Sequence, residues 1–249
     1  MKIAVCVKRV PDTATKIRIG GDQKSIDPAD VQYIISPYDE FAIEEALVVK
    51  EKSGAESVTV VSVGPEATQQ NLRQALAMGA DEAILVRSDD ALDPFQTARN
   101  LANALTDGGY DLVFFGRLSV DDQGGQVGPL TARLLGIPCI TEIVEFSLEG
   151  SEAKVTREIE GAKEEVVVQL PAAFTAQKGL NEPRYASLKG IMAAKKKPIH
   201  DRAVDAVDAR LNTTSLDLPP GRPPGKIVGE GVEAVAELVR LLREEAKAI

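Results

Sequence analysis

Short apolar runs alternate with longer amphipathic segments along the first half of the chain. The runs that have the length of buried parallel strands are residues 2–7, 57–64, 82–88 and 111–116. The segments whose apolar residues recur at helical spacing are residues 36–54, 65–80, 93–109 and 124–138. Alternation of this kind predicts an α/β fold with a doubly wound, mostly parallel sheet and right-handed crossovers.

The pattern changes after Pro138. Residues 139–176 predict several strands joined by tight turns at Glu149-Gly150 and Glu160-Gly161. Val155, Arg157 and Ile159 alternate in the manner of a half-buried strand, so we expect an antiparallel segment at the far end of the sheet. Residues 177–200 show no clear periodicity.

A Pro/Gly-rich linker, "LPPGRPPGK" at residues 218–226, precedes an amphipathic C-terminus. Its apolar stripe consists of Val232, Val235, Leu238, Val239, Leu242 and Ala246. We expect the stripe to pack on another surface, such as a partner chain, while folding back on its own domain stays open. The division predicted is an α/β domain over residues 1–200 and a C-terminal arm and helix over residues 201–249.

Composition narrows the function. The 249 residues carry 29 Lys+Arg against 38 Asp+Glu, a net charge of −9, and aromatic residues make up 4% with no Trp. Stacking platforms for sugars or single strands are therefore disfavoured. Cys6 and Cys139 lie far apart in apolar runs, which is typical of thiols in a reducing compartment. The N-terminus shows no export signal and no apolar run could span a bilayer, so we expect a cytoplasmic protein.

The sequence contains no recognisable set of catalytic residues, so it gives little support for an enzyme. His200 is the single histidine, which argues against a histidine triad or a multi-histidine metal site. Asp12, Asp39, Asp121 and Asp122 are candidate general bases, but no nucleophile with an adjacent base can be assembled, and such residues commonly serve turns and caps.

A ligand site is predicted beyond the carboxyl ends of the strands. The segments expected to meet there are residues 6–9, 36–39, 63–64 and 116–129. Gly124 and Gly125 precede a helix whose free amides suit a phosphate, and Asp121 and Asp122 suit ribose hydroxyls or a turn cap. Since neither GxGxxG nor GxxxxGK[ST] is present, the spacing alone slightly favours an ordinary glycine-rich junction that binds nothing.

The stretch "NEPRYASLKGIMAAKKKPI", residues 181–199, places cations around an apolar tip. A short basic run in an acidic chain disfavours nucleic-acid binding, and the lack of an amphipathic basic helix with aromatics disfavours a membrane surface. Leu188, Ile191 and Met192 favour a protein-docking loop, because exposed apolar tips mark contact sites.

This stretch resembles the recognition loop of the β subunit of electron-transfer flavoproteins, whose pattern is NEPRYA-x-L-x-x-IM-x-AKKK-x-I. "VCVKRVPD", "SPYDEFAIEEAL", "ALAMGAD", "VTREIEG" and "LPAAFTA" echo further family motifs in the same order. The resemblance covers nearly the whole chain.

The resemblance implies an electron-carrier subunit rather than an enzyme. Its partner would be an α subunit that holds most of the FAD contacts. Acyl-CoA dehydrogenases and related flavin dehydrogenases would reduce the flavin, and a membrane quinone oxidoreductase would reoxidise it. The C-terminal helix would pack on the flavin-carrying domain of the α subunit. A structural AMP would lie in this subunit.

By position, the resemblance assigns the cofactor contacts to Cys6, Ser36, Pro37, Tyr38, Asp39, Val63, Gly116, Arg117, Leu118, Ser119, Val120, Asp121, Asp122, Gln123, Gly124, Gly125, Gln126 and Val127. Partner docking would use Leu188, Ile191, Met192, Lys195, Lys196 and Lys197, with Leu188 as the anchor. Glu158 would contact an arginine of the flavin domain.

Departures from the common form leave alternatives. The common form often has Asn where this chain has Ser36, and flavin-bifurcating relatives hold a second FAD in the AMP position with "DGDTAQVGP". This chain shares "QVGP" with the bifurcating relatives but has Asp122-Gln123 in place of their Gly-Asp, which favours AMP. An adenine-nucleotide-binding enzyme on a similar sheet is the alternative outside the family, although it would need a pyrophosphatase-type Gly-Ser loop or a HIGH-like motif.

Overall fold

A computed structural model describes residues 1–222 and 224–249, and within them nine strands form one sheet in the order β11-β5-β4-β1-β6-β10-β7-β8-β9. The central strands β1 (Lys2–Cys6), β4 (Ser57–Gly64), β5 (Glu82–Arg87) and β6 (Leu112–Gly116) pair in parallel. The predicted α/β fold with a mostly parallel sheet is confirmed.

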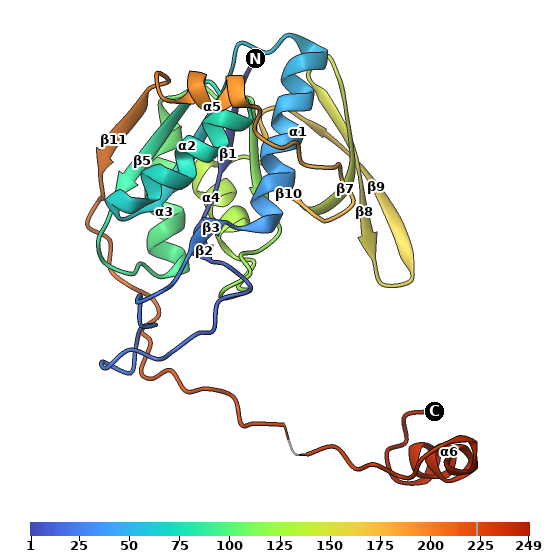
Figure 1. The fold of residues 1–249 in the computed structure, drawn as a ribbon. Helices are drawn as coiled ribbons and strands as arrows, with labels where there is room; N and C mark the ends of the chain where they lie inside the picture. Colours follow the sequence, from blue (N-terminus) through green and yellow to red (C-terminus); the bar gives the residue numbers. More distant parts are fainter. Residues whose placement is uncertain (223) are drawn as a thin grey trace.

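Helices cover both faces of this sheet (Figure 1). On one face, α1 (Pro37–Ser53) and α2 (Gln69–Met78) bury apolar side chains together with Ile3 and Val5. On the other, α3 (Pro94–Thr106) and α4 (Val127–Leu135) pack with Ala4 and Cys6. Successive β1 residues enter opposite layers because a strand alternates its side chains. A central strand buried on both faces explains the continuous apolar runs.

The helix boundaries follow local signals. Pro37 begins α1, at a position where a backbone N–H would have no helical acceptor, so the proline costs no hydrogen bond. Gly54 ends the helix at φ +68°. Asp93 caps α3 in a capping box with Gln96, each side chain bonding the other's backbone N–H. Residues 65–80 begin with a separate 3-10 turn, η1 (Glu66–Thr68), after Pro65.

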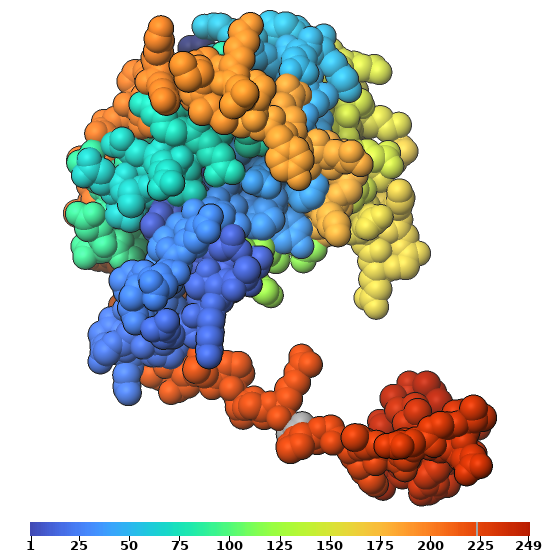
Figure 2. All heavy atoms as spheres, in the orientation of Figure 1, coloured from blue at the N-terminus to red at the C-terminus, as the bar shows by residue number. Residues whose placement is uncertain are grey.

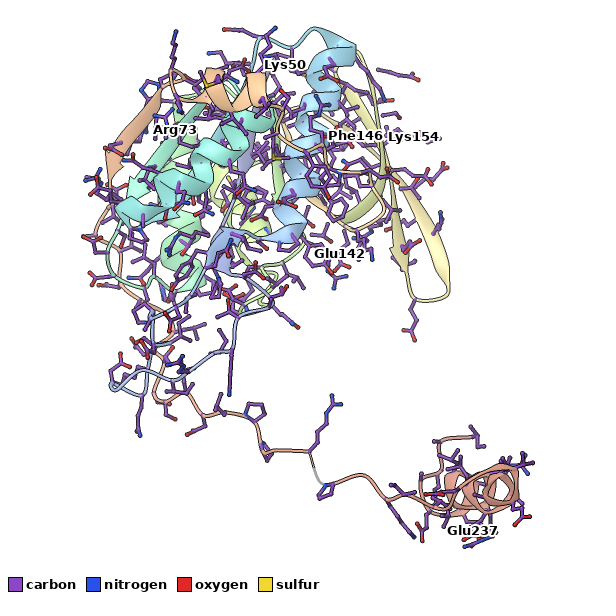
Figure 3. All side chains as sticks on the ribbon, in the orientation of Figure 1. Lys50, Arg73, Glu142, Phe146, Lys154 and Glu237 are labelled. Atoms are coloured by element: carbon purple, nitrogen blue, oxygen red, sulfur yellow. The ribbon has the colours of Figure 1, made fainter. Side chains whose placement is uncertain are left out.

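The far end of the sheet is antiparallel, as predicted. β7 (Cys139–Glu149), β8 (Glu152–Ile159) and β9 (Ala162–Gln169) form this part, and β10 (Ala172–Ala176) is inserted between β6 and β7. Phe146, labelled in Figure 3, packs edge-on against Phe114 and Phe174 at centroid distances of 5.4 and 5.2 Å. This aromatic cluster ties the extension to the parallel core.

Several short elements were not predicted from the hydrophobic pattern. β2 (Arg9–Pro11) and β3 (Tyr33–Ile35) form a small separate antiparallel sheet. The aperiodic stretch 177–200 contains α5 (Leu188–Ala194) and the start of β11 (Ile199–Ala203), which joins the sheet beside β5. Elements this short carry too few residues for a period to be visible.

The C-terminal arm leaves the sheet after β11 and carries η2 (Val232–Ala234) and α6 (Val235–Glu244). Figures 1 and 2 show α6 standing apart from the α/β unit, and Glu237, labelled in Figure 3, lies on it. In this single chain Val232, Val235 and Leu238 of the apolar stripe are exposed, whereas Leu241 is the buried residue of the helix.

The first part of the C-terminal arm is hydrogen-bonded to α3 and to its N-terminal cap. The Asn100 side chain accepts the backbone amide of Asp205 and donates to the Asp205 carbonyl. The Gln96 side chain donates to the carbonyl of Val207 at 2.7 Å. The Asp93 carboxylate accepts the amides of Arg210 and Leu211. Residues 204–211 are therefore fastened along α3 before the linker begins.

The two ends of the parallel strands face opposite poles of the molecule. In Figure 1 the α5 segment lies at the upper pole, while β2, β3 and the departing arm lie at the lower pole. The β8–β9 hairpin also projects downward, toward the side where α6 lies. Sites at the carboxyl ends of the strands and sites on α5 are consequently separated by about the length of the strands (Figure 1).

Candidate nucleotide pocket and docking loop

A pocket of about 390 Å³ lies beyond the carboxyl ends of β1, β4 and β6. This volume falls within the range of small-molecule sites. The predicted residues that line it are Cys6, Asp39, Val63, Gly116, Arg117, Leu118, Ser119, Asp121, Asp122, Gly124, Gly125, Gln126 and Val127. The segments that sequence reasoning brought together thus meet at one cavity.

Other predicted residues do not line the cavity. Ser36, Pro37 and Tyr38 lie behind Asp39, where the Ser36 hydroxyl is buried without a hydrogen-bond partner. The Tyr38 ring stacks 5.7 Å below the Arg117 guanidinium, a cation–π contact that braces the pocket wall. Val120 and Gln123 also lie outside the lining, on the turn itself.

Asp39 forms the floor of the pocket from the first turn of α1. Its carboxylate accepts the amide of Lys8 at 2.7 Å and the amide of Gly116 at 3.0 Å. Burial raises the pKa of Asp39 to about 7, against the lowering effect of these two amides. Asp39 therefore joins the ends of β1 and β6 and titrates near neutral pH.

The neighbouring thiol offers no nucleophile. Cys6 is buried at the end of β1, and its burial, together with the nearby Asp39, raises its pKa well above the usual range. A thiol needs its thiolate form to react, so Cys6 serves the pocket as a small apolar wall.

The glycine-rich turn between β6 and α4 forms the opposite wall. Gly125 adopts φ +61° and Gln123 adopts φ +53°, so the turn uses two left-handed residues to aim its backbone at the cavity. Asp122 accepts the amide of Gly124 at 2.9 Å and the hydroxyl of Ser119 at 2.8 Å. The first amides of α4 have no intrahelical partners, which suits an anion such as a phosphate.

Lys8 crosses the mouth of the pocket. It lies in segment 6–9, which was expected at the ligand site, but no cofactor contact was assigned to Lys8 itself. Its ammonium bonds Ser119 at 3.2 Å and pairs with Asp121 at 2.8 Å and Asp122 at 2.9 Å. Burial lowers the pKa of Lys8, but its pairing with Asp121 and Asp122 outweighs burial, so the pKa lies above the usual range. Lys8 is therefore a permanent cation at this site.

A whole side of the pocket was missed from the sequence. It follows β5 and includes the start of α3. The lining residues on this side are Ser88, Asp90, Ala91, Leu92, Pro94, Thr97 and Leu101. Pro65, Thr68 and Phe115 also line the pocket without having been predicted, whereas Val7, Lys8, Arg9, Gly64 and Gly128 lie in the segments that were expected to meet there. Ligands of such sheets bind beyond the carboxyl ends of the strands. Because β5 is one of these strands, the segment that follows it could have been predicted to line the pocket.

The fit of a nucleotide rests on the two different ends of this cavity. One end has the glycine-rich turn and the N-terminus of α4, which suit a phosphate. The other has apolar walls from Val63, Leu92 and Leu101 together with the buried hydroxyl of Thr68, which has no hydrogen-bond partner. An unsatisfied buried hydroxyl beside an apolar wall suits a heteroaromatic base.

The loop that carries the predicted docking residues is held firmly at its base. Arg184 pairs with Glu44 at 2.8 Å and with Glu51 at 2.5 Å, and the Arg184 amide also donates to Glu44. Asn181 donates to the carbonyl of Phe41 and to the Glu45 carboxylate. These bonds fasten the loop to α1, so its tip is presented in one orientation.

A second set of bonds holds α5 on the C-terminal end of α2. Arg73, labelled in Figure 3, donates to the carbonyls of Ala194 and Lys197 at 2.6 and 2.5 Å. Lys197 in turn donates to the carbonyls of Leu76 and Ala80. Lys197 thus satisfies the last carbonyls of its own subunit's helix, whereas Lys195 and Lys196 are exposed.

The tip of the loop is apolar and exposed. Leu188 is 84% exposed, and Ile191 and Met192 are exposed beside it. Tyr185, which was not among the predicted site residues, is 99% exposed on the same loop. Figure 2 shows the loop, in orange, lying across α1 and α2 as a raised surface. Large apolar side chains gathered on a fixed support are typical of a protein contact.

Glu158 lies near the tip of the β8–β9 hairpin, where it faces Lys163 across the strand pair and is exposed. The hairpin projects toward the lower pole in Figure 1, away from the docking loop.

In the part of the chain that the structure describes, no cluster of three or more His, Cys, Asp or Glu side chains has the arrangement of a metal site. None of the helices described there is long and apolar enough to cross a membrane.

Known proteins similar to this chain agree with one another. The family model for the electron transfer flavoprotein domain matches residues 24–207. A Bacillus subtilis (strain 168) protein named electron transfer flavoprotein subunit beta is 43% identical, with 100% of each chain covered. Proteins of the same name from Bradyrhizobium diazoefficiens and Homo sapiens are 40% and 41% identical, covering 99% and 98% of this chain and 99% and 97% of their own.

Proposed function

This chain belongs to the electron transfer flavoprotein family, and on that premise we propose that it is a β subunit that holds AMP and docks dehydrogenases through the Leu188 loop. The family's name describes an electron carrier rather than an enzyme, and the name "subunit beta" implies an α subunit as partner.

The observation that carries the AMP proposal is the two-ended pocket. The glycine-rich turn with Gly124 and Gly125 takes the phosphate, and the wall with Val63 and Leu92 takes the adenine. AMP here is structural: it is held between β1, β4 and α4 and is not turned over. Asp39 supports it indirectly, by fixing the strand ends that form the pocket floor.

FAD belongs mainly to the α subunit in this proposal and supplies the centre that accepts and passes on electrons. The present chain contributes surfaces at its lower pole. The arm with its exposed stripe on α6 packs on the flavin-carrying domain, and Glu158 contacts an arginine of that domain. An exposed apolar stripe on a helix that stands apart from its own core favours a partner-chain contact.

The docking loop lies at the opposite pole, fixed by Arg184 and Lys197. Leu188 enters an apolar pocket on an acyl-CoA dehydrogenase or a related flavin dehydrogenase, flanked by Ile191 and Met192. Lys195 and Lys196 steer the encounter. Separation of the poles lets the dehydrogenase stay anchored while the flavin domain moves at the lower pole. Electrons then pass to a membrane quinone oxidoreductase, and we place the subunit in the cytoplasm.

The experiment is to purify the heterodimer with its α subunit, denature it and identify the released nucleotides by mass spectrometry. One FAD and one AMP for each heterodimer is the expected result. Two FAD and no AMP would instead assign the pocket to a second flavin, as in a bifurcating form. Release of FAD without any nucleotide from this subunit would overturn the pocket assignment.

A further inference from the structure

Lys8 connects the end of β1 to the glycine-rich turn across the mouth of the pocket. We propose that Lys8 is a positioning residue that fastens this turn over the bound nucleotide and thereby sets how slowly the nucleotide leaves. The inference rests on the proposed function, since it assumes that the pocket holds a nucleotide.

The base of this tether is immobile. The Lys8 amide donates to the buried carboxylate of Asp39 at 2.7 Å, and the Lys8 carbonyl accepts the amide of Ser36 at 2.9 Å. Both partners belong to the start of α1, which is packed in the core. The Lys8 side chain therefore extends from a fixed point.

The other end of the tether is an exposed turn. Lys8 reaches Ser119, Asp121 and Asp122, which lie more than a hundred residues further along the chain. Asp122 also accepts the amide of Gly124, so the bond from Lys8 to Asp122 holds the backbone of the turn as well as its side chains. Without Lys8, the turn would rely on its own short bonds, such as that from Ser119 to Asp122.

The bonding capacity of the ammonium separates a tether from a direct ligand. A lysine ammonium has three N–H donors. Ser119, Asp121 and Asp122 occupy all three, so a phosphate could bind Lys8 only by breaking the tether. Phosphate recognition is left to the amides of the turn and of α4, while Lys8 holds those amides in place.

Charge supports the same role. Asp121 and Asp122 place two carboxylates where an anionic phosphate would enter, and their repulsion of the phosphate is offset by the Lys8 ammonium. The Lys8 side chain is 42% exposed, so dissolved salt reaches the ion pairs and weakens them. Salt dependence of nucleotide release is therefore a signature of this tether.

The test measures exchange of isotopically labelled AMP from the purified heterodimer with excess unlabelled AMP. We expect Lys8→Met to release AMP about tenfold faster than the wild type, because the turn is no longer fastened to the end of β1; this factor corresponds to about 1.4 kcal/mol in the barrier to release. Wild-type release should accelerate between low and high salt, and release from Lys8→Met should not. Lys8→Arg should recover slow, salt-sensitive release.

Two further variants make the measurement specific. The double variant Asp121→Asn with Asp122→Asn should lose the acceleration of release by salt, as Lys8→Met does, and adding Lys8→Met to it should change the salt dependence little, because both remove the same ion pairs. Lys50→Met removes another lysine–aspartate pair, that with Asp81 at 2.6 Å, outside the pocket. AMP release from Lys50→Met should equal that of the wild type.

Equal release rates in Lys8→Met and wild type would overturn the inference while leaving the AMP site intact. If the wild-type heterodimer contains no AMP, the proposed function fails instead. Amide hydrogen exchange over residues 118–126 then still decides the tether: faster exchange in Lys8→Met supports it, and unchanged exchange rejects it.

Discussion

The carboxylate of Asp39 accepts the backbone amide of Gly116 at 3.0 Å, and this bond joins the first turn of α1 to the last residue of β6. The approach is so close that a Cβ at Gly116 would lie 2.8 Å from the backbone nitrogen of Asp39. Gly116 is required here by space rather than by backbone angle. The pocket floor depends on this contact, since the other Asp39 oxygen holds the end of β1.

Gly116→Ala should consequently separate α1 from β6. We expect a loss of roughly 1–3 kcal/mol in the free energy of unfolding, as for other overpacked sites, and loss of bound AMP. Urea unfolding and nucleotide content check both. Gly21→Ala is the control, because a Cβ there meets nothing within 4 Å. Wild-type stability and full AMP in Gly116→Ala would contradict this account of the floor.

Gly125→Val should lower AMP content. Gly125 adopts φ +61°, where a β-branched side chain is strained by roughly 1–2 kcal/mol, and the strained turn would turn its amides away from the phosphate. Gly136→Val is matched to it, with φ +73° at the end of α4 but outside the pocket. Both variants should lose stability, and only Gly125→Val should lose AMP. Equal AMP content in the two would place the phosphate elsewhere.

Asp39 should make stability depend on pH. Its pKa is raised from 3.8 to about 7 on folding, so the folded protein binds this proton more tightly than the unfolded chain. The free energy of unfolding should therefore decline as pH rises from about 4 to about 7, by roughly 1.4 kcal/mol for each pH unit where the proton difference is complete. Below about pH 4 this destabilisation is absent.

The measurement is urea unfolding of wild type and Asp39→Asn across this pH interval. The variant loses an acceptor and should be less stable throughout, but the difference between the two proteins should shrink as pH rises. A difference that is constant with pH would show that Asp39 keeps an ordinary pKa.

Leu188→Ala should weaken docking without affecting the fold. Leu188 is 84% exposed, so its truncation should change stability by less than about 0.5 kcal/mol. Full burial of a leucine in a partner pocket contributes roughly 1.5–3 kcal/mol, so electron acceptance at limiting dehydrogenase should fall about tenfold or more. Val167→Ala, another exposed apolar residue on β9, is the control. Unimpaired electron acceptance in Leu188→Ala would reject Leu188 as the anchor.

Lys196 and Lys197 should behave differently although they are adjacent. Lys196→Glu should slow association with a dehydrogenase in a salt-dependent way and leave stability unchanged, since its side chain is exposed. Lys197→Glu should destabilise the fold by roughly 1–3 kcal/mol, because its ammonium satisfies the carbonyls of Leu76 and Ala80. Stopped-flow kinetics over a salt series and urea unfolding distinguish them. Identical phenotypes would mean that Lys197 acts as a surface charge.

The sequence predicted the elements whose signals are local and long. The runs that became β1, β4, β5 and β6 are buried on both faces and so are uniformly apolar, and Pro37 and Gly54 marked the ends of α1. The antiparallel end was also predicted, because Gly150 and Gly161 punctuate alternating strands. Motif order in the chain was enough to identify the family.

What only the tertiary structure decided was the set of contacts between distant residues. β11 joins β5 from more than a hundred residues away, and the β5–α3 wall enters the pocket without any motif of its own. The lysine triplet reads as one charge run, yet Lys197 turns inward because the end of α2 lies beneath it. Lys8 likewise became a tether only when the fold brought Asp121 and Asp122 to it. Sequence periodicity records which face a residue buries, but a side chain's partner depends on which elements pack together.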